Sequence, residues 1–376
     1  MSSFYYWYVL IFVMLFSLLA MSFIAKCLRF NLDRINATIS AVILWFFMAF
    51  RSMFVGTDTK QYVYIFEQIE SLKFSELFST RLYFYGGRYL FGLSNFPKGY
   101  LIFNKLLTYI SSNGQTITIA CTTLIFAFMI RLLKKRSSYP MLSLWLFYTL
   151  GIYQTDMNVM RNAVIVFWCY LCFDLVEKQR LVLYIFCVLL ASSFHLSALL
   201  FIPFYWIINR VDFTPKLIRR LLLTAIVFGV LLSFMRPVLA SVLPSVFAQY
   251  FDDNSEKLEG LIVGALHLGL VFGIFFISAK RNWRYMADAD RVGIWMLLAE
   301  TFFFALGIGM RSSLRMAALF GPYIIILIPN LIDKSSKNGN KNVVLLIIIV
   351  LTGLQYLLRI RINNIGGSMP YSFFWA

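Results

Sequence analysis

The chain has 376 residues, of which 60% are hydrophobic and only 14% are charged, whereas a typical soluble domain carries about 25% charged residues. Its formal net charge is +17, but lysine and arginine beside apolar segments are the usual topology signal of membrane proteins, so the charge does not indicate a nucleic-acid partner. Five cysteines in or beside apolar segments and only two histidines argue against a zinc centre, because no four ligands have suitable spacing.

Apolar segments long enough to cross a membrane recur along the whole chain. A spanning α-helix needs about 20 apolar residues. Because no extended hydrophilic domain interrupts these segments, residues 1–376 are expected to form a single integral membrane domain with an all-α, polytopic fold. About ten spanning helices are predicted, at residues 4–25, 36–54, 114–133, 139–155, 158–177, 217–236, 258–279, 292–310, 313–331 and 342–360.

Clusters of lysine and arginine mark one side of the predicted membrane domain. Positive residues accumulate in cytoplasmic loops, so these clusters are predicted to be cytoplasmic. The alternation of spans then places both termini outside. The clusters are Lys26, Arg29 and Arg34; Arg131, Lys134, Lys135 and Arg136; Lys178 and Arg180; Arg210, Lys216, Arg219 and Arg220; Lys280, Arg281 and Arg284; and Lys334, Lys337 and Lys341.

The longest hydrophilic stretch follows the second predicted span and is expected outside the membrane. Gly56 and Thr57 allow a turn, and either Thr57 or Asp58 is suited to cap a following helix. The charge of Asp58 also favours a helix N-terminus. Residues 98–112 carry two lysines and an asparagine, which is too polar for a lipid-facing span, so they are interpreted as an amphipathic helix on the outer face. Residues 55–113 therefore form an outer loop with an amphipathic helix.

The apolar segment 181–208 is long for one spanning helix and short for two. Basic residues flank both ends, which predicts that both ends lie on the inner side. A re-entrant helical hairpin satisfies this condition, with a break near Ser192, Ser193 and His195 that must be covered by protein or a wet cavity. The alternative is one long tilted helix, which would put the basic residues that follow it on the wrong side.

Four arginines depart from the inside-positive pattern, because each lies within about two helical turns of a predicted outer helix end. A buried arginine in a membrane needs a partner or a wet cavity, and the planar guanidinium fork matches phosphate oxygens. A shared anionic target is one explanation for Arg51, Arg161, Arg311 and Arg315. The other is that they reach headgroups one by one, or pair with Asp58, Asp156 and Glu300.

Four further side chains are candidates for chemistry at the same outer face. Asp58 offers a carboxylate that could accept a proton or orient a sugar hydroxyl, and Tyr62, one turn later, offers a ring for sugar stacking. His195 has a side chain that titrates near neutral pH, and Glu300 stands in the middle of an apolar helix. Three of them have a structural alternative as well: a helix cap for Asp58, packing for Tyr62 and an arginine pair for Glu300.

Nucleotide and zinc-hydrolase motifs are missing from the sequence. It contains no G-x-x-x-x-G-K-[ST], no strand-linked G-x-G-x-x-G and no H-E-x-x-H. A reaction at an outer face without nucleotide needs a substrate that was activated beforehand. A polyprenyl diphosphate sugar meets this need, because it has a membrane-soluble tail, a diphosphate for arginines and a good leaving group.

Several stretches of the sequence resemble the Wzy-type polysaccharide polymerases, especially the EpsG-like branch. Their order, spacing and surrounding hydropathy match over almost the whole chain. One departure is Asn162, where the family often has glutamine after the arginine. The stretches are R-x4-GTDTKQY (51–62), MNVMRNAVIVFWCYLCF (157–173), SSFHLSALLFIPFY (192–205), MRSSLRMAALFGPY (310–323) and the terminal PYSFF (370–374).

The resemblance implies a GT-C-like membrane glycosyltransferase of the bacterial inner membrane, with its active site facing the periplasm. It would join repeat units of O-antigen, capsule or exopolysaccharide, using undecaprenyl-diphosphate-linked glycans as donor and acceptor. A chain-length regulator and membrane lipids are the other expected partners, and neither a metal nor another cofactor is expected. Arg161, Arg311 and Arg315 would hold the donor diphosphate, Arg51 would hold the acceptor diphosphate or orient Asp58, and Asp58, His195 or Glu300 would be the base.

Two other functions are compatible with the same sequence. An O-antigen ligase transfers finished glycan to lipid A core, but such proteins usually carry a larger outer loop than residues 55–97 or 237–257 provide. A lipid-glycan flippase would need inverted repeats and a charged path to both faces, whereas the unusual charges here gather at one face.

Overall fold

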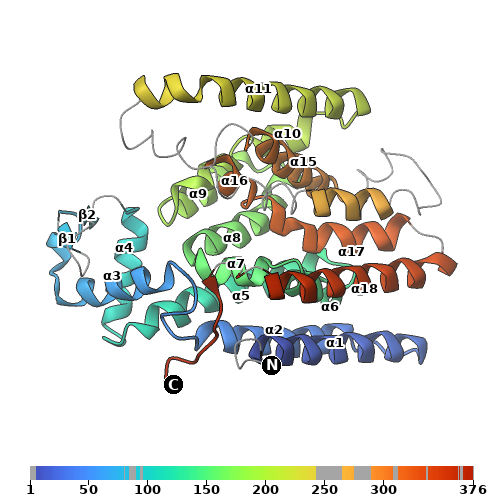
Figure 1. Ribbon diagram of the computed structural model, residues 1–376, viewed down its shortest axis with the longest axis horizontal. Helices are drawn as coiled ribbons and strands as arrows, with labels where there is room; N and C mark the ends of the chain where they lie inside the picture. Colours follow the sequence, from blue (N-terminus) through green and yellow to red (C-terminus); the bar gives the residue numbers. More distant parts are fainter. Residues whose placement is uncertain are drawn as a thin grey trace. The chain divides into compact units, whose positions relative to one another are not determined.

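The computed structural model describes residues 6–79, 81–83, 90–93, 96–242, 265–274, 289–307, 312–335, 338–362, 364 and 367–375. Helices dominate these residues, which confirms the all-α prediction (Figure 1). The α-helices are α1 (Tyr6–Cys27), α2 (Asp33–Ala49), α3 (Thr59–Ser71), α4 (Lys98–Thr108), α5 (Gln115–Arg136), α6 (Pro140–Thr149), α7 (Ile152–Asn158), α8 (Met160–Glu177), α9 (Leu181–Ser192), α10 (Phe204–Arg210), α11 (Pro215–Val242), α15 (Arg291–Leu306), α16 (Ser312–Ala317), α17 (Ile324–Ser335) and α18 (Asn338–Ile362).

Short elements join these helices. A two-stranded antiparallel hairpin pairs β1 (Arg81–Tyr83) with β2 (Leu90–Gly92), with Leu82 opposite Phe91. The short 3₁₀ helices are η2 (Phe74–Glu76), η4 (Leu196–Phe201) and η5 (Gly321–Tyr323). One further apolar helix spans Ala265–Ile274.

Five helices in the described part of the chain are long and apolar enough to cross a membrane. They are Tyr6–Lys26, Gln115–Arg136, Lys216–Met235, Ser313–Lys334 and Lys341–Arg359. The protein is therefore a polytopic helical membrane protein, as the sequence predicts. The predicted number of crossings is larger because several predicted spans are shorter or interrupted in the structure; for example, α6 ends at Thr149 and the chain turns through Gly151, whose φ is +82°, before α7 begins.

The chain forms two compact units, and each is described by itself. The first unit comprises Met1–Arg136, Pro140–Tyr205 and Leu351–Ala376, and the second comprises Ser137–Tyr139 and Trp206–Val350. In the first unit α2 packs against α1, α5 and α6, while α8 packs between α5 and α9. Buried polar groups there are paired across helices: Trp145 Nε1 donates to Thr352 Oγ1 over 3.0 Å, and the Tyr153 hydroxyl donates to the Leu44 carbonyl over 2.9 Å.

The C-terminal segment closes over the end of α2 in the first unit. The Tyr371 hydroxyl donates to the Phe47 carbonyl over 2.7 Å, and the backbone N–H of Phe374 donates to the Phe50 carbonyl over 3.1 Å. Arg51 and Phe373 form an isolated antiparallel β-bridge between these hydrogen bonds. The terminal PYSFF stretch is thus a structural clamp on the backbone that leads from α2 into the outer region.

The outer region of the first unit has its own small core, and Figure 1 shows α3, α4 and the hairpin together beyond the ends of α1 and α2. Lys105 Nζ donates to the carbonyls of Ile69 and Glu70 at the C-terminus of α3, where unpaired carbonyls favour a cation. Asn104 and Lys105 are buried on α4, whereas Leu106 is exposed. A helix therefore occupies most of the predicted segment 98–112, but Asn104 and Lys105 face inward and only Lys98 of its three predicted polar residues is exposed. The five buried side chains of the core are Ile65, Ile69, Leu77, Leu93 and Leu101.

The segment 181–208 is broken where the sequence predicts a break. Helix α9 ends at Ser192, and η4 and α10 follow a turn at Ser193 and Phe194. The chain doubles back, because the Tyr184 hydroxyl donates to the Phe201 carbonyl over 2.6 Å. One continuous tilted helix is therefore wrong, and the re-entrant position of this hairpin stays a prediction.

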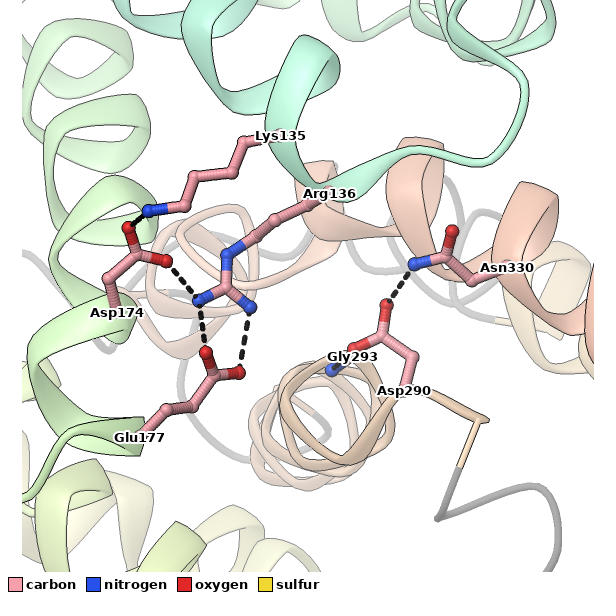
Figure 2. Close-up of polar contacts among 7 residues, drawn as sticks. All are labelled: Lys135, Arg136, Asp174, Glu177, Asp290, Gly293 and Asn330. Carbon is pink, nitrogen blue, oxygen red and sulfur yellow. Dashed lines mark hydrogen bonds and ion pairs between the residues drawn. The ribbon is translucent and has the colours of Figure 1, made fainter.

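The second unit is built on α11, α15, α16 and α17. Helices α11 and α15 approach closely at Gly229, where a Cβ atom would lie 2.4 Å from the Ala305 carbonyl oxygen. Asp290 caps α15 by accepting from the backbone N–H of Gly293 over 2.8 Å, and it also accepts from Asn330 Nδ2 over 2.8 Å (Figure 2). These bonds tie the start of α15 to α17.

Candidate active site

Arg161 is surrounded by aromatic rings near the start of α8. Its guanidinium carbon lies 4.9 Å from the ring centroids of both Phe96 and Tyr100 and 5.5 Å from that of Tyr62. Aromatic faces attract cations, and such contacts strengthen when water is excluded. The Nε atom of Arg161 is buried without a hydrogen-bond partner. In the described part of the chain no carboxylate forms an ion pair with it. We call Arg161, Tyr62, Phe96 and Tyr100 the arginine cage.

The fold holds this cage by docking α4 on the break after α9. The backbone N–H of Tyr100 donates to the Ser193 carbonyl over 3.1 Å. Gly99 permits this approach, since a Cβ atom there would lie 2.2 Å from Ser193 Oγ. The Phe194 ring then packs edge-on to Tyr100 with centroids 5.6 Å apart. A cage residue and the helix break are therefore fixed to each other.

Tyr62 stands on α3, and its hydroxyl stays protonated at neutral pH. Burial raises the pKa of Tyr62 to about 12, an effect that Arg161 partly offsets. A protonated phenol can donate a hydrogen bond to an oxygen atom of a bound sugar or phosphate. The predicted sugar-binding residue is thus a wall of the arginine cage.

His195 caps the 3₁₀ turn η4 through its ring nitrogen Nδ1. The backbone N–H of Ser197 donates to Nδ1 over 3.3 Å, and Ser197 Oγ lies 2.6 Å from the same atom. Because a backbone N–H can only donate, Nδ1 is an acceptor and the neutral ring carries its proton on Nε2. Ser197 Oγ also bonds Asn162 Oδ1 over 3.1 Å. His195 is therefore linked to the residue that follows Arg161 in α8.

Asp58 lies at the start of α3, half-buried, next to the end of α7. The predicted turn is present, since Gly56 has a φ of +92°. Asp58 occupies the N-cap position, but its side chain makes no capping bond. Instead its backbone N–H donates to Asn158 Oδ1 over 2.8 Å, and the Thr57 hydroxyl donates to Asp58 Oδ1 over 3.2 Å. The capping prediction is wrong for this side chain, which leaves the carboxylate available.

Arg51 differs from the prediction, because it is fully buried and contacts backbone carbonyls rather than a carboxylate. Helix α2 ends at Ala49, so Arg51 follows the helix instead of lying inside its end. Its Nη1 donates to the Met48 carbonyl and its Nη2 donates to the Met157 carbonyl over 2.6 Å. The guanidinium ties the end of α2 to the end of α7. It has no contact with Asp58 among these bonds, so the structure favours a structural role.

Glu300 belongs to the second unit and is also buried. Its Oε1 lies 2.7 Å from Nδ1 of His267, which stands on the helix Ala265–Ile274. The neighbouring Gly321 leaves room for this carboxylate, since a Cβ atom there would lie 2.3 Å from Oε1. The partner found for Glu300 in the described residues is a histidine, not the arginine that the sequence suggested as the structural alternative.

Comparison with protein families assigns the sequence around the arginine cage to a known family. The model of the EpsG family matches residues 34–373, which include the cage, the break after α9 and the C-terminal clamp. The chain belongs to the EpsG family. No curated protein and no solved structure matches it. EpsG-family membership indicates a polysaccharide polymerase-like role for this membrane protein.

The two remaining predicted arginines of this EpsG-family protein, Arg311 and Arg315, are not among the residues of the arginine cage. Arg315 is an exposed residue of α16 in the second unit. Arg311 lies outside the described residues. A common anionic target for all four arginines therefore stays a prediction. Of the predicted site residues, Arg161, Tyr62, Asp58 and His195 belong to the first unit.

Sequence reasoning missed several residues of the site. Phe96 and Tyr100 carry no chemical signal of their own, and only the packing of α4 brings them to Arg161. Asn158 and Ser197 are short polar side chains next to helix termini, which is where such residues bond backbone groups. Their positions close to Arg161 and His195 in the sequence were the available signal.

Proposed function

We propose that this EpsG-family protein is a membrane glycosyltransferase that polymerises polyprenyl-diphosphate-linked oligosaccharide repeat units. The growing chain would leave its undecaprenyl diphosphate and join a hydroxyl of the next lipid-linked unit at the periplasmic face of the bacterial inner membrane. The observation that carries the proposal is the arginine cage, in which a half-buried guanidinium meets aromatic rings and, within the described residues, no carboxylate.

Arg161 is our candidate for the donor diphosphate. A partly buried cation favours an anion strongly when no internal carboxylate neutralises it, because the surroundings screen the charge less than bulk water does. Arg161 is also the second residue of α8, a helix of 18 residues, so the positive end of the helix dipole acts on the same place. Phe96, the partly exposed ring of the cage, offers a face for the sugar next to the diphosphate. We keep Arg311 and Arg315 as further diphosphate ligands on sequence grounds alone.

The reaction needs one proton acceptor and stabilisation of one leaving group. The acceptor hydroxyl attacks the anomeric carbon of the donor, the bond from that carbon to the diphosphate oxygen breaks, and the hydroxyl proton passes to a base. We assign the base to Asp58, which is half-buried and lies one helical turn before Tyr62 of the cage. His195 has its Nε2–H available as a donor toward the departing diphosphate, because Nδ1 is occupied by Ser197.

Glu300 and Arg51 are not given catalytic roles in this scheme. The Glu300 carboxylate is engaged by His267, and Arg51 is engaged by carbonyls of α2 and α7. Arg51 instead supports the backbone from which Asp58 and the start of α3 extend.

The test is polymerisation in a strain that lacks the gene, complemented with Arg161→Lys or Arg161→Gln. Removal of one such electrostatic contact is expected to lower the rate about 10²–10³-fold, and lysine should rescue poorly because it lacks the planar fork. Glycan length on a gel separates the possible functions. Lipid A core with a single repeat unit indicates a lost polymerase, core without glycan indicates a lost ligase, and repeat units stranded inside indicate a lost flippase. Full chain length with both variants would contradict the proposal.

A further inference from the structure

Several basic residues lie at the end of α5 that is farther from the outer region. Some of them are paired with carboxylates and others are not. Lys135 contacts Asp174, and Arg136 bonds Asp174 over 2.7 Å and Glu177 over 2.9 Å (Figure 2). These ion pairs fasten α5 to α8. The charges of Lys135 and Arg136 are therefore already balanced by carboxylates of the same unit.

Three neighbouring cations lack such partners. Arg34 on α2 and both Arg131 and Lys134 on α5 are exposed, and none of them forms an ion pair within the described ranges. On α5 the residues Ala127, Ile130, Arg131 and Lys134 are spaced by three and four positions, so they lie on one face of the helix. That face changes from apolar to basic along its length.

Two hollows accompany these unpaired cations. An open hollow of about 440 Å³ lies over α5 and is lined by Ala127, Ile130 and Arg131 together with Lys134 and Lys135. A narrow crevice between α2, α5 and α6 adjoins it, since both share Ile130 and Lys134. Arg34 stands on the crevice wall, and its apolar lining includes Leu133 and Leu144.

We propose that this surface binds one anionic glycerophospholipid of the surrounding membrane. Its phosphate would lie among Arg34, Arg131 and Lys134, and an acyl chain would run along Ile130 and Ala127. Basic pockets between membrane helices are suited to anionic headgroups, and the order of apolar and basic positions on α5 matches the order of tail and headgroup in a lipid. A zwitterionic lipid lacks the net negative charge that three unpaired cations favour.

The proposal is tested on the full-length protein by native mass spectrometry with added dioleoylphosphatidylglycerol or dioleoylphosphatidylcholine. We expect the first phosphatidylglycerol to bind at least about five-fold more tightly than phosphatidylcholine, since each cation near an anionic lipid is worth roughly a five-fold change. The double variant Arg34→Gln/Lys134→Gln should lose that preference. Equal affinity of the wild-type protein for the two lipids would overturn the proposal.

Two further variants separate a built site from diffuse attraction. Lys216→Gln/Arg219→Gln removes the same charge from exposed positions of α11 and should change phosphatidylglycerol affinity less than two-fold. Ala127→Trp fills the hollow without changing charge and should weaken binding at least about three-fold. An equal loss in both charge variants, or full binding by Ala127→Trp, would show that no specific groove is used.

Discussion

A hydrogen bond of 3.1 Å joins the Ser197 hydroxyl to the side-chain amide of Asn162, which links the break after α9 to the first turn of α8. The two residues are 35 positions apart in the sequence. Because Asn162 follows Arg161 and Ser197 holds Nδ1 of His195, this bond couples the placement of the two groups that we assign to the donor diphosphate. Both Asn162 and Ser197 are thus positioning residues in our scheme.

Replacement of Ser197 by alanine should lower polymerisation about ten-fold. The ring of His195 would lose the hydroxyl that lies 2.6 Å from Nδ1 and keep only the backbone N–H at 3.3 Å, so its orientation would be held less firmly. The measurement is the rate of oligomer formation by purified protein with a synthetic lipid-diphosphate repeat unit. Asn162→Gln is the matched control, since glutamine keeps the amide group and should retain most activity. Equal losses in Ser197→Ala and Asn162→Gln would contradict a hydrogen-bond role.

Loss of one wall of the arginine cage should weaken donor binding. Phe96→Leu keeps an apolar side chain of similar size but removes the ring 4.9 Å from the guanidinium. A cation–π contact is worth about 1 kcal/mol. Without it the guanidinium should be held less firmly, and KM for the donor should therefore rise about five-fold. Leu15→Met, a change at a buried position of α1, a helix that carries no cage residue, serves as the control. An unchanged KM in Phe96→Leu would show that the ring does not support Arg161.

Arg51→Met should destabilise the protein while donor binding by the folded fraction stays intact. The variant leaves the carbonyls of Met48 and Met157 without the guanidinium that bonds them, and a buried unsatisfied acceptor costs about 1–3 kcal/mol. Thermal unfolding in detergent, together with donor affinity measured below the transition, separates these effects. A folded variant that has lost donor affinity would restore Arg51 to the diphosphate site.

The sequence predicts which single residues are chemically reactive better than it predicts which residues surround them in the structure. Arg161, Tyr62, Asp58 and His195 are recognisable because each is a reactive or polar side chain beside a helix end. The cage walls Phe96 and Tyr100 are not recognisable, since aromatic residues are abundant in this chain and only the docking of α4 selects these two. Arg51 illustrates the opposite error. Its charge suggests a ligand, but helix α2 ends two residues earlier, and the carbonyls at that end provide the partners.

Gly99→Ala should loosen the contact between α4 and the break after α9. The new Cβ atom would lie 2.2 Å from Ser193 Oγ and 2.8 Å from the Ser193 carbonyl oxygen, so one element must move. Overpacking of this kind costs about 1–3 kcal/mol. Gly269→Ala is the control in another helix, because nothing lies within 4 Å of its added Cβ. The midpoint of thermal unfolding should fall for Gly99→Ala but not for Gly269→Ala. The double variant Gly99→Ala/Ser193→Gly should recover part of the loss.

The buried pair of Glu300 and His267 should stabilise the second unit without taking part in chemistry. Glu300→Ala leaves His267 Nδ1 without its partner at 2.7 Å, and loss of one member of a buried pair costs about 3–5 kcal/mol. Glu300→Gln keeps a hydrogen-bond acceptor of the same shape, so it should retain both stability and chain polymerisation. Thermal unfolding and glycan length measured on the same variants distinguish the two roles. Stable Glu300→Gln protein that no longer extends glycan would make Glu300 a catalytic carboxylate after all.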